Sequence, residues 1–95
     1  MKKEGSVLTV VLGEELTRIN SPVLMEELAS YRDQDVEKVV FDATKLTHLS
    51  SSGVRVIIFC KQRLGAGPEI VFANCNKDIF DVLDIVGIVR FITFV

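Results

Sequence analysis

The sequence predicts a small single-domain α/β fold, in which a mixed and mostly parallel sheet of four to five strands packs against amphipathic helices. Short runs of β-branched and aromatic residues alternate along the chain with segments whose apolar residues recur at helical spacing. The length of 95 residues suits one domain, which we place at residues 1–95. An apolar content of 48% is enough to build the single core that such a domain needs.

Four segments are predicted to form strands. Each is a compact apolar run that is rich in Val, Ile or Phe, as buried strands are. They are residues 7–12 (VLTVVL), 38–42 (KVVFD), 69–73 (EIVFA) and 91–95 (FITFV). Because helical segments separate these strands, we expect mostly parallel neighbours that are joined by right-handed crossovers.

The first predicted helix starts at Ser21 and Pro22. Ser21 can cap it, and Pro22 suits the first helical position because its missing N–H would have no partner there. The residues Leu24, Leu28 and Tyr31 follow at i, i+4 and i+7, so they would form one apolar face.

The second predicted helix covers residues 54–64, although its run VRVIIF would also suit a strand. We predict a helix because serines precede the run as a capping signal, no Gly or Pro interrupts it, and Gly65 stands where a helix would stop. Five residues at helical spacing would face the core: Gly53, Val56, Ile57, Cys60 and Leu64.

The third predicted helix lies between the last two strands. Asn76 would cap its start and Gly87 would end it. Four apolar residues at helical spacing would form its buried face: Ile79, Val82, Leu83 and Val86.

The composition argues against several classes of protein. A formal net charge of −2 without a Lys/Arg cluster is unlike a protein that binds nucleic acid. No apolar run approaches the ~20 residues of a bilayer span, and the amino-terminal MKKEGS lacks the apolar stretch of a signal peptide. We therefore expect no membrane insertion and a cytoplasmic location. Cys60 and Cys75 suit neither a disulfide framework nor a zinc site, so both are expected as reduced thiols.

Catalysis is not predicted, and neither is a metal or a cofactor. The single histidine, His48, lies close to Ser51 in the sequence, but no GxSxG elbow surrounds the serine and no oxyanion donors are evident. Serine pairs before a helix are common as simple N-caps. By itself, the run of three serines at residues 50–52 would therefore indicate only a capped loop.

Three stretches of the chain resemble STAS domains, the small α/β modules that include the bacterial anti-sigma-factor antagonists. Residues 13–22 (GEELTRINSP) are similar to the family's opening motif. Residues 38–58 (KVVFDATKLTHLSSSGVRVII) are similar to its central strand, Asp-Ser-Ser-Gly signature and helix. Residues 69–95 resemble its last strand–helix–strand unit, so the likeness covers nearly the whole chain.

Two positions depart from the family pattern. Ser50 stands where the family has the aspartate of its signature, and Thr17 aligns with the aspartate of the opening motif. The first departure bears on mechanism, because Ser50 directly precedes the Ser-Ser-Gly part of the signature at residues 51–53.

The resemblance implies that Ser51 is the hydroxyl that a partner serine kinase phosphorylates, with Ser52 and Gly53 completing the motif. A phosphate at a helix start would meet unsatisfied N–H groups and should not unfold the domain. It would add about −1.5 to −2 charge, which should end docking of a partner on this loop. Six residues are expected to contact the partner: Ser50, Ser51, Ser52, Gly53, Val54 and Ile58.

Gly53 would keep the surface shallow, so that the backbone of a partner can approach. Val54 and Ile58 lie one turn apart beside the core face of the helix, and the sequence supports two interpretations of them equally. They are either additional core residues or an apolar rim that meets the partner.

The leading hypothesis is therefore an anti-sigma-factor antagonist, a phosphoprotein that acts in signal transduction and transcription regulation. It would bind an anti-sigma factor with serine-kinase activity, and a phosphatase would restore the unmodified form. Two alternatives stay open. One is a non-phosphorylated STAS scaffold or transporter-associated subunit, in which a homo-oligomer would form. The other is a small-anion or nucleotide-binding module at the same helix start.

Overall fold

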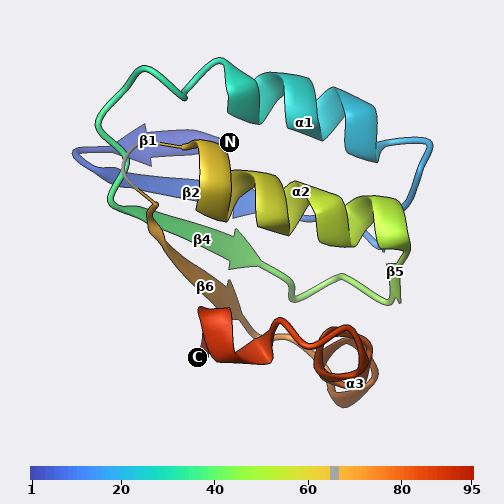
Figure 1. Ribbon diagram of the computed structural model, residues 1–95. Helices are drawn as coiled ribbons and strands as arrows, with labels where there is room; N and C mark the ends of the chain where they lie inside the picture. Colours follow the sequence, from blue (N-terminus) through green and yellow to red (C-terminus); the bar gives the residue numbers. More distant parts are fainter. Residues whose placement is uncertain (65–66) are drawn as a thin grey trace.

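A five-stranded sheet forms one layer of the molecule, and helices cover one of its faces (Figure 1). The structure is a computed structural model that describes residues 1–64 and 67–95. The strands lie in the order β1-β2-β4-β6-β7. Three parallel strands form the centre: β2 (Val7–Val11), β4 (Lys38–Asp42) and β6 (Glu69–Ala73). The predicted α/β class and mostly parallel sheet are confirmed.

Two short strands complete the edges of this sheet. At one edge, β7 (Ile92–Phe94) runs parallel to β6 and follows a short 3₁₀ helix, η1 (Val89–Phe91). At the other edge, β1 (Lys2–Glu4) pairs antiparallel with β2. Gly5 makes the tight turn between them with a φ of 59°, which a residue with a side chain rarely adopts. β1 is not among the strands that the sequence predicts.

The helices α1 (Ser21–Ala29) and α2 (Ser51–Arg63) lie side by side over the sheet, whereas α3 (Lys77–Ile85) is seen end-on in Figure 1 because it runs across them. The prediction of a helix for the VRVIIF run is confirmed, and this helix starts at the serines themselves. The prediction that Gly65 ends this helix falls on a residue outside the described ranges. No helix in the described part of the chain has the length and apolar content that crossing a bilayer requires.

The expected cap of α1 is wrong, because the N-cap residue is Asn20 and Ser21 is already helical. The Ser21 hydroxyl is buried and has no hydrogen-bond partner among the residues described. The side chain of Asn20 closes the preceding loop instead, since it accepts the Thr17 amide at 2.8 Å and donates to the Glu15 carbonyl at 2.7 Å.

The core lies between the helices and one face of the sheet. The register aligns its inward side chains in two rows across β2, β4, β6 and β7: Leu8, Val39, Ile70 and Ile92, then Val10, Phe41, Phe72 and Phe94. The prediction that β2 is buried throughout is only half right, because Val11 is 64% exposed. The helices cover a single face, so residues that alternate with the core rows point away from it.

The core face predicted for α2 is confirmed. Val56, Ile57, Cys60 and Leu64 are buried against the sheet. Burial raises the pKa of the Cys60 thiol to about 12, because the apolar surroundings disfavour the thiolate. Cys75 is also a free thiol, at an intermediate depth.

Both ends of α3 follow the prediction. The Asn76 side chain accepts the Ile79 amide at 2.9 Å and so caps the start. Gly87 ends the helix with a φ of 81°, and its amide donates to the Asp84 carbonyl at 3.0 Å. Val86 is wrongly assigned to the buried face, since it lies at the C-cap and is 47% exposed.

The orientation of α2 can be tested with neighbouring substitutions. Val56→Asp should destabilise the protein by more than about 3 kcal/mol, because an unpaired charge would enter the core at a fully buried position. Arg55→Asp should change the free energy of unfolding by no more than about 0.5 kcal/mol, because Arg55 is exposed. Denaturant unfolding measures both, and equal small losses would show that the assigned face of α2 is wrong.

Candidate functional site

The serine loop connects a short strand to α2 and is held from the side by another segment. The strand β5 (His48–Leu49) pairs in parallel with β3 (Glu15–Leu16), which forms a separate two-stranded sheet. The Leu16 carbonyl also accepts the Ser50 amide at 3.0 Å. These contacts join segments more than 30 residues apart, so the start of α2 is anchored before the helix begins.

Ser50 is the N-cap residue of α2. Its backbone is extended, and its hydroxyl accepts the Gly53 amide at 3.4 Å and donates to the Leu16 carbonyl at 3.4 Å. Serine and aspartate are both good N-cap residues, because each offers a side-chain oxygen to the first-turn amides. Ser50 therefore performs the capping that an aspartate at this position would perform.

Ser51 is the first residue of α2 and its side chain is exposed. Neither of the side-chain hydrogen bonds that fix the loop uses its hydroxyl. The amides of the first helical turn lie beside it, and the helix dipole places about half a positive charge there. The hydroxyl is thus accessible to another protein, in surroundings that favour a negatively charged group.

Ser52 turns toward the neighbouring helix. Together with Arg55 it lines a groove of about 430 Å³ between α1 and α2, whose other side includes Met25 and Glu26 of α1. This groove starts beside the serine loop, so a protein that covered Ser51 would also have access to it.

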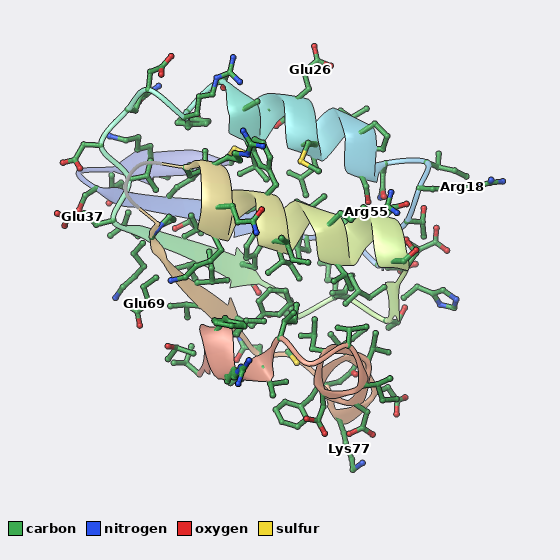
Figure 2. The ribbon with its side chains drawn as sticks, in the orientation of Figure 1. Arg18, Glu26, Glu37, Arg55, Glu69 and Lys77 are labelled. Atoms are coloured by element: carbon green, nitrogen blue, oxygen red, sulfur yellow. The ribbon has the colours of Figure 1, made fainter. Side chains whose placement is uncertain are left out.

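Arg55 is a residue of this surface that the sequence analysis does not assign to the site. It is exposed on α2 (Figure 2) and lies four residues after Ser51, which is one turn along the same face. None of the ion pairs in the described ranges uses its guanidinium. The i, i+4 spacing from the serine is the signal in the sequence that could have identified it.

Gly53 has a different role from the expected one. It is buried, and a Cβ added to it would lie 2.7 Å from the Leu16 carbonyl oxygen and 2.7 Å from Leu49 Cδ1. Both distances are too short for any real contact. The missing side chain therefore makes room for the anchoring segment of the protein itself, not for the backbone of a partner.

Val54 and Ile58 differ in their exposure to solvent. Val54 is 7% exposed and belongs to the core, whereas Ile58 is 36% exposed. Ile58 lies about 10 Å from Ser51 along the helix axis, given the rise of ~1.5 Å per residue. The structure thus brings the residues 50–53 together at the loop, places Val54 behind them, and leaves Ile58 two turns away on the exposed side of α2.

Comparisons with known proteins agree on one family. The STAS domain family model matches residues 1–95. A protein of Bordetella bronchiseptica named "Putative anti-sigma factor antagonist BtrV" is 30% identical over 88 residues, which cover 92% of this chain and 76% of that protein.

Two solved structures share the fold. The anti-sigma factor antagonist SpoIIAA in its unphosphorylated form superimposes with a TM-score of 0.74 at 16% identity, over 88% of this chain and 78% of that one. An anti-sigma factor antagonist from Mycobacterium paratuberculosis superimposes with a TM-score of 0.82 at 14% identity, over 98% of this chain and 80% of that one.

The anchoring of the loop can be tested at Gly53. Gly53→Ala should destabilise the protein by about 1–3 kcal/mol, because the new methyl group must displace the Leu16 backbone. The higher helix propensity of alanine, worth at most ~1 kcal/mol, should not offset this cost. Urea unfolding monitored by circular dichroism gives the difference.

Gly13→Ala is the matched control, because a Cβ at Gly13 meets nothing within 4 Å. We expect it to be neutral or slightly stabilising. If Gly53→Ala unfolded at the same urea concentration as Gly13→Ala, the proposed packing of Leu16 on α2 would be incorrect.

Proposed function

The chain belongs to the STAS domain family, and from this premise we propose that it is an anti-sigma factor antagonist that acts by binding an anti-sigma factor. This binding would release a sigma factor in the cytoplasm and so permit transcription. The observation that carries the proposal is the exposed Ser51 hydroxyl at the anchored start of α2. The similarity to BtrV over most of both chains supports the same class of activity.

Ser51 is the proposed point of control. A bound anti-sigma factor with serine-kinase activity would transfer the γ-phosphoryl group of ATP to the Ser51 hydroxyl and release ADP. A phosphatase would hydrolyse the phosphate ester and restore the serine. In this scheme the domain is a ligand and a substrate, and it needs no catalytic group of its own.

The fold should tolerate the phosphate. The Ser51 side chain is exposed, so no packing has to move, and the start of α2 offers amides and a favourable dipole to an anion. Arg55 lies one turn further along the same face and adds a positive charge at the i+4 position. Modification therefore should not reduce the stability of the domain.

Phosphate at Ser51 should, in contrast, weaken the binding of the anti-sigma factor. A partner that covers Ser51 would have to remove water from a group carrying about −1.5 to −2 charge. This desolvation is costly unless the partner supplies matching cations at that position. Because the domain should stay folded, the main effect of phosphorylation would be the loss of binding to the partner.

Substitutions at Ser51 test the proposal. Ser51→Ala should fold and bind the anti-sigma factor as the wild type does, since it removes one exposed hydroxyl that caps nothing. Ser51→Asp should also fold, because a carboxylate suits the start of a helix, but it should bind at least about tenfold more weakly. The anti-sigma factor would be isolated from native lysate with the wild-type protein, and the dissociation constants measured by calorimetry.

Gln34→Asp is the charge control, because it adds one negative charge at an exposed position on the loop after α1. It should bind like the wild type.

Incubation with the purified anti-sigma factor and ATP should place phosphate on Ser51. Ser50→Asp, which restores the family residue, should accelerate this transfer. The proposal fails if Ser51→Asp binds like Gln34→Asp and no phosphate appears on any of the three serines.

A further inference from the structure

On the face of the sheet that the helices cover, one strip is left without a helix above it. α1 and α2 lie along the sheet, but α3 runs across them near the carboxyl end of β6 (Figure 1). Beside α2, over β6 and β7, the structure has a groove of about 290 Å³. This volume is close to the lower end of the ~300–1,000 Å³ that is usual for small-molecule sites.

The walls of the groove are almost entirely apolar. Ile57, Ile70 and Ile92 are buried at its base, whereas Ile58 and Phe91 are 36% and 51% exposed. Six apolar residues contribute to the lining: Ile57, Ile58, Ile70, Ile88, Phe91 and Ile92. Branched aliphatic side chains that stay partly exposed on both sides of a groove favour an apolar occupant, because covering them removes apolar surface from water.

The polar groups of the groove are few and carry one sign of charge. Lys61 and Gln62 line one side, and among the described residues the lining contains no acid. The Lys61 ammonium, which has three N–H donors, donates to the Pro68 carbonyl at 3.1 Å, and this is its only side-chain hydrogen bond to the described residues. Arg90 adds a second positive charge nearby, because its guanidinium lies 5.1 Å from the centroid of the Phe91 ring.

We propose that this groove binds a free straight-chain carboxylate, with the acyl chain along the isoleucines and the carboxylate against Lys61. The chemistry of the lining matches the two ends of such a molecule: an apolar groove for the chain, and the Lys61 ammonium for the anion. The site is separate from the serine loop, since Ser51 does not line it.

Dodecanoate is the probe for a first experiment, below its micelle concentration. Five of the eight isoleucines of the chain line the groove, so spectra of protein with ¹³C-labelled isoleucine methyl groups report on it directly. We expect saturable shifts of the Ile58 and Ile88 methyl groups and none at Ile19 or Ile85, which lie outside the groove. Absent or non-saturable shifts, or equal shifts at Ile19 and Ile85, would overturn the proposal.

Three variants assign the interactions. Ile58→Glu should weaken dodecanoate binding at least about tenfold, because it places a charge against the chain. Ile19→Glu, a matched change at a position that is 83% exposed in a different groove, should not alter it. Lys61→Gln should weaken dodecanoate about two- to fivefold and leave dodecanol unchanged. If dodecanoate bound equally well to the wild type, to Ile58→Glu and to Lys61→Gln, the assigned site would be wrong.

The same variants distinguish two other possible occupants of the groove, a second copy of the chain and a membrane lipid. A dimer that Ile58→Glu dissociates in analytical ultracentrifugation, without binding of dodecanoate, would show that a second copy of the chain covers the groove. Binding to phosphatidylglycerol vesicles that is lost in Ile58→Glu, again without binding of the free carboxylate, would assign the groove to a membrane lipid. Either result would overturn the proposal.

Discussion

The contact between Leu16 and the first turn of α2 is the interaction on which the candidate site depends. The Leu16 carbonyl accepts the Ser50 amide, and Gly53 leaves the space that this approach requires. Without it, the serine loop would be a flexible connection of the kind that follows many strands. With it, a segment from the first part of the chain fixes where α2 begins, and therefore which serine caps the helix, which is exposed and which faces α1.

The residues 50–53 divide the tasks of the site among four consecutive positions. Ser50 caps the helix, Ser51 meets solvent, Ser52 faces the groove between α1 and α2, and Gly53 packs inward. Because the exposed hydroxyl has no part in capping or packing, its chemistry can change without disturbing either. This separation makes a modification that alters binding, but not folding, physically reasonable at Ser51.

The sequence was sufficient for the features that depend on local patterns. The bounds of β4 and β6 and the role of Asn76 follow from strand composition and capping preferences, and the structure agrees with them. Local preferences do not separate Ser21 from Asn20 at the start of α1: Asn20 occupies the N-cap position, but its side chain bonds to the Thr17 amide and makes no capping hydrogen bond. The short strands β3 and β5 and the steric role of Gly53 depend on pairing across more than 30 residues, which no local window contains.

The most direct test of the central claim is a comparison of amide ¹H–¹⁵N spectra of the unmodified protein and of the protein carrying phosphoserine at position 51. Our account predicts chemical-shift changes confined to the first turn of α2 and to the segment around Leu16, which contacts it, with the resonances of β2, β4 and β6 unchanged. A loss of dispersion, or shifts spread through the sheet, would contradict it. Such a result would mean that phosphate at Ser51 acts by disrupting the fold and not by changing the surface that a partner meets.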